Sequence, residues 1–580
     1  MINNKAHSRV DSRSAAPKRT LLSLSLTAAL LTACGGTGQD DGSPSTIEQE
    51  FSGAVLDGYL ARATVFIDSN NNGTRDAWEA YAFTDNEGFY SFNPNTNTDY
   101  CADTASAQEK QYCLVSNISH TNVVVRVDGG YDVLTGEPFL GQLTRRVDAS
   151  NDQGAPTDSL ISPITSLLTS ALTEEQTAAM LNALGLQPAD LDTDYLNSDG
   201  NGTVDANLLN KALTIHKAVT VLADRLNDTY DEIGDNFGTP NDASAAVYDA
   251  LAESVASIGT LDGALQPAAL YEILDQAEEE LKAVYNRKDL SLPADMGDAQ
   301  NPQSFQRIAE IVSDIPPVVD ALFDATGTAP VNNVAGRARA LESLVLKAVN
   351  ESDNNDSTIE NAVEFFTSND NEPLIGALID SLDSDTADLG SLSTNDFSGT
   401  DFDSVLEIAA SSSIPENSRP ITRVGGTTLR LSDLFLGSAP NKLDDNEVEF
   451  YFDGQPGDTD GSFTACVKVI EDANEDGTLG DGNTRGDVAD GFWSMLPGPG
   501  GDSTTTYNLV MTINFLGATY QGIVKAGGLE TREGVEYQAM RFDNDGKLET
   551  WYTQSGFVEG GTAPADAADC EARLPSRVGI

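Results

Sequence analysis

Residues 64–79 read TVFIDSNNNGTRDAWE, an apolar run followed by a loop rich in Asp, Asn and Gly. Gly73 stands at the sixth position of the loop, where a sharp turn is needed, and Thr74 offers its carbonyl at the seventh. Ca²⁺ prefers about six to eight hard oxygen ligands in a flexible shell. The register predicts a calcium-binding loop, and the alternative is a solvated Asn/Asp/Gly turn between strands. The predicted ligands are Asp68, Asn70, Asn72, Thr74, Asp76 and Glu79.

Strand-like runs surround this loop. Short apolar or alternating stretches are separated by Gly, Asn and Asp, a spacing typical of strands joined by turns. The stretches are residues 53–56, 63–67, 81–84, 89–92 and 121–127. They predict a small β-sandwich over residues 51–150 that contains the calcium loop.

Three segments of this region resemble a known class of domain. They are GAVLDG at 53–58, ATVFID at 63–68 and TDNEGFYSF at 84–92. Together they are similar to the carboxypeptidase-regulatory-like and Cna-B/SdrD-type β-sandwich repeats of bacterial surface proteins. The resemblance implies a spacer or adhesive module that often carries such a calcium loop. Residues 129–137 and 159–168 are similar to segments of calcium-binding surface lipoproteins of aquatic bacteria.

The N-terminus has the features of an export signal. Five basic residues precede the short apolar run 21–31, and LTACG follows at 31–35. This resembles the bacterial lipobox, in which the cysteine is lipidated and becomes the first mature residue. We therefore expect a lipoprotein signal peptide at 1–33, a lipid anchor on Cys34 and a flexible tether at 34–50. The resemblance implies an outer-membrane lipoprotein on the periplasmic or cell-surface face; a cleaved secretory signal is the alternative.

Four further cysteines predict disulfides, because their number is even and the protein is expected to be exported. Cys101 and Cys113 are close in sequence and share a predicted domain, which favours their pairing. Cys466 and Cys570 would then pair and fix the C-terminal tail to its domain. The other two pairings stay open, as does a set of four buried thiols.

Beyond residue 155 the pattern of apolar residues changes twice. From 155 to 412 they recur at three- and four-residue steps, which predicts a helical bundle; a lipid-binding groove would show the same periodicity. From 415 to 580 about seven or eight alternating runs predict an antiparallel β-sandwich or barrel. The expected fold class is therefore multidomain α+β.

Two weaker copies of the loop occur later in the chain. The first offers Asn197, Asp199, Asn201 and Asp205 but has Leu208 at its twelfth position. Calcium and a plain turn with a helix cap are both consistent with it. The second offers Asp472, Asn474 and Asp476, with Asn483 at the twelfth position, where Asp487 could supply the acid.

Charge and missing motifs exclude several functions. The chain has 91 acidic and 33 basic residues, a net charge of −58. Nucleic acid and anionic membrane surfaces are unsuitable partners, because phosphate contacts need Lys and Arg. No His-Glu-x-x-His, Gly-x-Ser-x-Gly or Walker sequence occurs. Paired carboxylates cannot be nominated from sequence among so many acids, so we expect a protein that is not an enzyme.

The expected function is that of a calcium-stabilised, surface-anchored lipoprotein serving as a binding or adhesion scaffold for a protein, glycan or hydrophobic ligand. One alternative is an accessory lipoprotein that carries or hands over a hydrophobic ligand in envelope transport. Another is a polymer hydrolase.

Overall fold

The computed structural model describes most of residues 49–345 and of residues 421–574. Within these ranges the longer stretches left undescribed are 148–156, 233–239, 288–301, 324–334, 433–446, 471–483 and 498–506. The predicted domain boundaries at 150–155 and 412–415 lie outside the described residues, as do the predicted signal peptide, Cys34 and the tether up to residue 48. The last two residues of the predicted tether, Gln49 and Glu50, instead begin strand β1, where they pair with β8.

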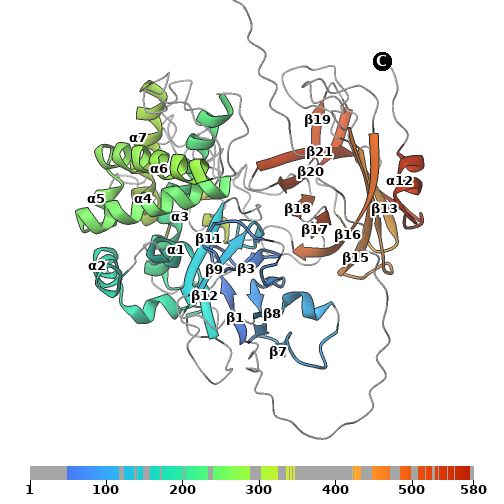
Figure 1. The fold of residues 1–580 in the computed structure, drawn as a ribbon, viewed down its shortest axis with the longest axis horizontal. Helices are drawn as coiled ribbons and strands as arrows, with labels where there is room; N and C mark the ends of the chain where they lie inside the picture. The colour runs from blue at the N-terminus through green and yellow to red at the C-terminus, as the bar shows by residue number, and fades with distance from the viewer. Residues whose placement is uncertain are drawn as a thin grey trace, which may run out of the picture. The chain divides into compact units, whose positions relative to one another are not determined.

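Two four-stranded sheets form the first part of the described chain (Figure 1). One has the order β12–β1–β5, with β8 also paired to β1, and the other has the order β11–β9–β3–β4. Every pairing in them is antiparallel except that of β1 with β12, which is parallel. The strands are β1 (Gln49–Val55), β3 (Thr64–Asp68), β4 (Tyr81–Phe83), β5 (Phe89–Tyr90), β8 (Leu114–Ser116), β9 (Val123–Asp128), β11 (Gln142–Val147) and β12 (Thr157–Ile161).

Two short two-stranded sheets complete this region. β2 (Leu60–Ala61) pairs with β10 (Tyr131–Asp132), and β6 (Phe92–Asn93) pairs with β7 (Thr98–Asp99). A single turn of 3₁₀ helix, η1 (Glu109–Tyr112), follows β7 in the chain. Cys101 and Cys113 lie on either side of this turn in the sequence. They form a disulfide with their Cα atoms 5.0 Å apart, which confirms the favoured pairing.

Close packing around β1 depends on a glycine. A Cβ atom on Gly53 would lie 1.8 Å from the carbonyl oxygen of Ser159 in β12 and 2.9 Å from the Tyr90 hydroxyl in β5. That hydroxyl lies 2.9 Å from the Ser159 Oγ, within hydrogen-bonding distance. Any larger residue at position 53 would therefore push β1 away from the strands on both of its sides.

Helices follow the sheets along the chain, as the change to a three- and four-residue spacing of apolar residues predicts. The bounds are α1 (Pro163–Thr169), α2 (Glu174–Leu184), η2 (Pro188–Asp192), α3 (Ala206–Glu232), α4 (Pro240–Ile258), α5 (Leu261–Ala264), α6 (Pro267–Arg287) and α7 (Pro302–Phe323). Thr173 begins α2 through a capping box with Gln176, and Gly185 ends it in the left-handed region at φ 67°. Residues 335–345 are helical where described.

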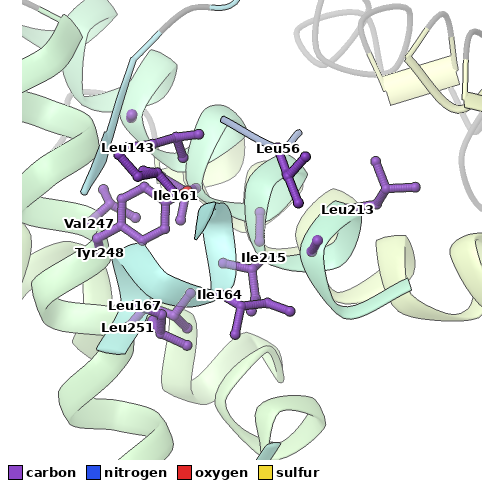
Figure 2. Packing of buried hydrophobic residues seen from close by; sticks show 14 of the residues in the cluster. Leu56, Leu143, Ile161, Ile164, Leu167, Leu213, Ile215, Val247, Tyr248 and Leu251 are labelled. Atoms are coloured by element: carbon purple, nitrogen blue, oxygen red, sulfur yellow. The ribbon is translucent and has the colours of Figure 1, made fainter. Parts of the chain in front are cut away.

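The sheets and the helices share one hydrophobic core. Leu56 follows β1, Leu143 lies in β11 and Ile161 ends β12, and they pack in the same cluster as the helical residues (Figure 2). The helical contribution shown there is Ile164 and Leu167 from α1, Leu213 and Ile215 from α3, and Val247, Tyr248 and Leu251 from α4. The predicted β-region and helical region are therefore joined through their interiors.

The C-terminal region is an antiparallel sheet that closes on itself. Its order is β14–β15–β16–β17–β18–β20–β21–β13, and β13 pairs in turn with β14. The sequence left two alternatives, a sandwich and a barrel. The strand order shows a sheet that closes on itself. The strands are β13 (Thr427–Ser432), β14 (Glu447–Phe452), β15 (Asp460–Ile470), β16 (Thr484–Pro497), β17 (Tyr507–Phe515), β18 (Ala518–Val524), β19 (Leu529–Arg532), β20 (Val535–Asn544), β21 (Lys547–Thr553) and β22 (Phe557–Glu559).

Alternate residues of these strands fill the interior of the closed sheet. Phe450, Phe452, Phe463 and Trp493 are buried, with ring centroids between 5.5 and 6.2 Å apart. Gly491 makes room for the Phe463 ring, because a Cβ there would lie 2.3 Å from it. The period of two seen in the sequence is thus the period of inward-facing side chains.

A short helix, α12 (Ala567–Arg573), is attached to this sheet by the second disulfide. Cys570 in α12 is bonded to Cys466 in β15, so both favoured pairings are confirmed. The expected fold class, multidomain α+β with N-terminal strands, central helices and a C-terminal antiparallel β region, is confirmed as well. Of the described helices, none is both long and apolar enough to cross a bilayer.

Candidate functional site

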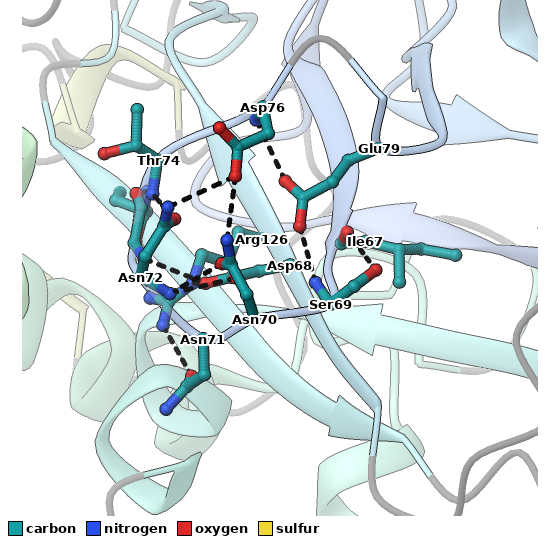
Figure 3. Close-up of polar contacts among 12 residues, drawn as sticks. Ile67, Asp68, Ser69, Asn70, Asn71, Asn72, Thr74, Asp76, Glu79 and Arg126 are labelled. Carbon is teal, nitrogen blue, oxygen red and sulfur yellow. Dashed lines mark hydrogen bonds and ion pairs between the residues drawn. The ribbon is translucent and has the colours of Figure 1, made fainter.

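The predicted calcium loop starts at the last residue of β3 and ends just before β4 (Figure 3). The Asp68 carboxylate accepts from the main-chain N–H of Asn72 at 3.1 Å and from that of Gly73 at 2.9 Å. Gly73 has a φ of 81°, a conformation that Gly adopts without strain. The side chain of Asp68 therefore folds the loop back over its own start.

Glu79 fixes the other end of the loop. One of its carboxylate oxygens accepts from the Ser69 N–H at 2.7 Å, and the other accepts from the Asp76 N–H at 3.0 Å. Burial raises the pKa of the Glu79 carboxyl, the two N–H donors lower it, and the charges of Asp68 and Asp76 raise it again. The pKa of this carboxyl lies above its usual value mainly because burial outweighs the two N–H donors.

Two asparagine amides lie between the carboxylates. The Nδ2 atoms of Asn70 and Asn72 donate to the same Asp76 oxygen, at 2.8 and 3.3 Å. Their Oδ1 atoms accept main-chain N–H groups, Asn70 from Asn72 at 3.1 Å and Asn72 from Thr74 at 2.9 Å. Thus five of the six predicted ligands, Thr74 apart, meet in one hydrogen-bonded network with their side chains.

An arginine that the sequence analysis did not nominate completes the network. The Arg126 Nε in β9 donates to the Asp68 Oδ2 at 2.5 Å, and its Nη2 donates to the Asn71 Oδ1 at 3.0 Å. Its Nη1 donates to Gln142 in β11 at 2.6 Å, and the Gln142 amide donates to the Gly73 carbonyl at 2.9 Å. A signal was present, because Arg126 is the one charged residue in the apolar run Val123–Val127.

The donor chemistry of the loop fits a hard cation. Three carboxylates, two amide oxygens and a main-chain carbonyl are all oxygen donors, and no sulfur or imidazole is among them. Arg126 neutralises one of the three carboxylates. Arg75 lies over the Tyr81 ring, 4.3 Å from its centroid.

The structure describes part of the first weaker copy of the loop and none of the predicted ligands of the second. In the first, the Asp205 carboxylate accepts from the N–H groups of Asn207 and Leu208, both at 3.1 Å, and so caps α3. Asn197 lies in the turn before it, whereas Asp199 and Asn201 lie outside the described residues. The second copy, with Asp472, Asn474 and Asp476, lies outside them entirely. This helix cap explains the presence of an Asp at position 205 without a bound metal.

A buried ionic cluster was also missed by sequence reasoning. It consists of Asp57 after β1, Asp132 in β10, His216 and Lys217 in α3, and Glu342. The His216 Nε2 lies 3.4 Å from an Asp57 oxygen, and the Lys217 Nζ is paired with the Glu342 carboxylate. The other Asp57 oxygen has no hydrogen-bond partner in the described chain. No sequence motif marks these residues, which are joined only by the packing of α3 on the sheets.

Burial within this cluster favours the neutral forms of Asp57 and His216 but not that of Lys217. Burial raises the pKa of the Asp57 carboxyl to about 8, with Lys217 opposing and Asp132 and Glu342 adding to the shift. Burial lowers the pKa of the His216 imidazole well below its usual value. Burial lowers the pKa of the Lys217 ammonium, but the charges of Glu342, Asp57 and Asp132 outweigh it and the pKa rises. Near neutral pH the cluster therefore holds a charged Lys217 beside a protonated Asp57.

Comparison of the chain with known protein families, with curated proteins and with solved structures gives no match.

Proposed function

We propose that the protein is an exported, calcium-stabilised binding scaffold, tethered to the cell envelope by lipid on Cys34. The observation that supports the proposal is the hydrogen-bonded network in which loop N–H groups and asparagine amides join Asp68, Asp76 and Glu79 (Figure 3). A bound calcium ion would supply the positive charge that Arg126 alone does not provide for these three carboxylates.

The chain's own residues would prepare the site. Asp68 and Glu79 hold the two ends of the loop through main-chain N–H groups, which fixes the loop before any ion arrives. Asn70 and Asn72 add amide oxygens, and Thr74 adds its carbonyl. A preformed loop loses less conformational entropy on binding than a free one.

Two disulfides support export, because such bonds persist mainly in oxidising compartments. The sequence from Lys5 to Gly35 supports lipidation at Cys34. Labelling of the protein with a fatty-acid analogue in its native host, compared between the natural chain and Cys34→Ala, tests the anchor. We expect label and membrane association to be lost in the variant; equal labelling would contradict a lipid on Cys34.

Thermal unfolding of the full mature chain tests the calcium proposal. We expect Ca²⁺ to raise the melting temperature relative to a chelator, and Mg²⁺ at the same ionic strength to raise it less. In Glu79→Gln the calcium effect should disappear, because the proposed bidentate ligand is lost. Asp103→Asn, an exposed carboxylate in the same region, is the matched control and should respond as the natural chain does. Equal melting of the natural chain with Ca²⁺ and with chelator would overturn the proposal.

The alternative functions have less support. Aromatic rings fill the described interior of the closed sheet, which weighs against a hydrophobic ligand there. Asp57 and Asp132 are a close pair of carboxyls, but they are only 2% and 6% exposed. That burial weighs against contact of this pair with a polymeric substrate.

A further inference from the structure

Asn72 and Gly73 form an Asn–Gly pair in the predicted calcium loop, and the Asn72 side chain is exposed. In such a pair the main-chain nitrogen of the glycine can attack the side-chain amide carbon of the asparagine, because the glycine has no Cβ to obstruct the approach. A Cβ on Gly73 would have no heavy atom within 4 Å apart from its chain neighbours, so the surroundings leave room for the attack. The other Asn–Gly pair of the sequence, at 201–202, lies outside the described residues.

A carboxylate lies where the attacking nitrogen must release its proton. The Gly73 N–H donates to the Asp68 Oδ2 at 2.9 Å, within the distance at which a side chain acts as a general base. The same oxygen accepts from the Arg126 Nε, so two donors hold the carboxylate in place. The Asp68 side chain is buried, so bulk water does not compete for this oxygen.

The side-chain amide of Asn72 is held at both of its ends (Figure 3). Its Oδ1 atom accepts from the Thr74 N–H at 2.9 Å, and a main-chain N–H can only donate, so this contact identifies the oxygen end. Negative charge develops on that oxygen when a nitrogen adds to the amide carbon, and an N–H directed at it acts as an oxyanion hole. The Nδ2 atom, which would leave, donates to the Asp76 Oδ2 at 3.3 Å.

The two preceding asparagines have only part of this arrangement. Asn70 and Asn71 are exposed in the same loop, but each is followed by another asparagine, whose Cβ obstructs the attack. The Asn70 Oδ1 accepts from the Asn72 N–H at 3.1 Å, and the Asn71 Oδ1 accepts from the Arg126 Nη2 at 3.0 Å. Three consecutive asparagines therefore differ in the group that follows them, and two of them serve as internal controls for the third.

We propose that Asn72 is a site of self-modification, at which the loop converts its own asparagine to an aspartate. The Gly73 nitrogen forms a bond to the Asn72 Cγ, and the Gly73 amide proton passes to Asp68. The bond from Cγ to Nδ2 then breaks, and the leaving nitrogen takes up that proton and departs as ammonia, which leaves a cyclic imide. Water opens the imide, giving aspartate when the new bond is cut and isoaspartate when the original main-chain bond is cut.

The aspartate product would add a carboxylate at the fifth position of the loop, which is one of the predicted ligand positions. Calcium loops are tuned by the number of charged ligands, so the converted loop should bind calcium more tightly than the natural one. Only this consequence rests on the proposed calcium loop, because the conversion itself needs no ion. Bound calcium should slow the conversion, since the oxygen atoms of Asp68 and Asn72 would then contact the ion.

Peptide mapping by mass spectrometry tests the conversion in the full mature chain, incubated folded and in chelator. We expect Asn72 to be converted while Asn70 and Asn71 stay intact. A synthetic peptide of residues 64–79 measures the reactivity of the sequence without the fold. The folded chain should react at least about tenfold faster, because the fold supplies the base and the oxyanion donor. No conversion at Asn72, conversion no faster than in the peptide, or equal conversion of all three asparagines would overturn the proposal.

Two variants test the roles of single residues. Asp68→Asn removes the proton acceptor and should slow the conversion at least about tenfold, whereas Asp103→Asn, which changes an exposed carboxylate outside the loop, should leave the rate unchanged. Because Asp68 also shapes the loop, Gly73→Ala is the second variant, and its added Cβ should slow the attack as well. An unchanged rate in both Asp68→Asn and Gly73→Ala would contradict the assigned chemistry.

The calcium proposal and the conversion fail separately. Asn72→Asp reproduces the aspartate product, and calorimetric titration with Ca²⁺ should show at least about tenfold tighter binding than in the natural chain. Conversion in chelator without any effect of Ca²⁺ on melting would overturn the calcium loop alone. A normal calcium effect on melting without conversion of Asn72 would overturn the self-modification alone.

Discussion

At the scale of single residues, Arg126 of β9 belongs to the same hydrogen-bonded network as the carboxylates of the loop. The Asp68 side chain is fully buried and Arg126 is 12% exposed, so their ion pair lies mostly out of water. Buried charges need partners, and removing one partner leaves the other unpaired. Arg126 therefore stabilises the loop without a bound calcium ion.

We expect Arg126→Gln to destabilise the protein by about 3 kcal/mol in chelator, because Asp68 loses its counter-charge. Calcium should then raise the melting temperature more in this variant than in the natural chain, since the ion would replace the missing charge. Lys110→Gln, which removes an exposed cation outside the loop, is the control and should show the natural response. An equal or smaller calcium effect in Arg126→Gln would argue against an ion beside Asp68.

The buried Asp57 gives a prediction about pH. Its pKa in the folded chain is about 8, above the ordinary value of 3.8, so between these values the folded state binds more protons than the unfolded state. Its contribution to stability is complete below about pH 4 and is lost as the pH rises towards 8. Asp57→Asn mimics the protonated acid and should remove this loss.

Melting temperatures at pH 5, 6, 7 and 8 measure the effect. The natural chain should lose stability relative to Asp57→Asn as the pH rises, while Asp103→Asn should run parallel to the natural chain. Asp132, His216 and Lys217 lie around Asp57 and interact with its charge, so the difference between the two curves reports proton binding by this buried cluster. Parallel curves for Asp57→Asn and the natural chain would refute the raised pKa.

At the scale of elements, the alternation of apolar residues located only part of the strands. It predicted about seven or eight C-terminal strands, where the sheet has ten, and it did not predict β8, β11 and β12 of the N-terminal region. The longer C-terminal runs are strands because one side chain in two faces a filled interior. The rule for proline was less informative. Pro316 and Pro317 predict a break or kink, yet α7 continues through both, with Ile315, Val318 and Val319 buried around them. Packing of that apolar face outweighs the lost main-chain donors.

The second disulfide should matter more than the first. It closes a loop with a sequence separation of 104, against 12 for Cys101–Cys113. In the chain-entropy model, closing the long loop is worth about 4–5 kcal/mol. We expect Cys466→Ala/Cys570→Ala to lower the denaturant midpoint of the C-terminal sheet more than Cys101→Ala/Cys113→Ala does. A smaller fall in the midpoint than for the N-terminal pair would show that the stabilisation by Cys466–Cys570 does not come from loop-closure entropy.

At the scale of the whole molecule, a net charge of −58 repels itself. Salt screens that repulsion over a Debye length of about 10 Å at 0.1 M. We expect the melting temperature to rise by several degrees between low and 0.5 M NaCl in the presence of chelator. Flat melting across this range would mean that the charges are already balanced within the fold.

The same scale shows how far the sequence alone could reach. The loop ligands lie within twelve consecutive residues, so their spacing could be read directly. Arg126 lies 58 residues from Asp68, and Lys217 lies far from Asp57, so only the assembled fold brings them together.

The parallel pairing of β1 with β12 has a consequence for biogenesis. Phe51 pairs with Thr157, so one edge of β1 has no neighbour until about a hundred further residues have been synthesised. An exposed strand edge is a template for pairing with other chains. While the chain is synthesised from its N-terminus, this edge would be bare until β12 emerges. The partly synthesised domain should therefore be more prone to pairing with other chains than the finished one.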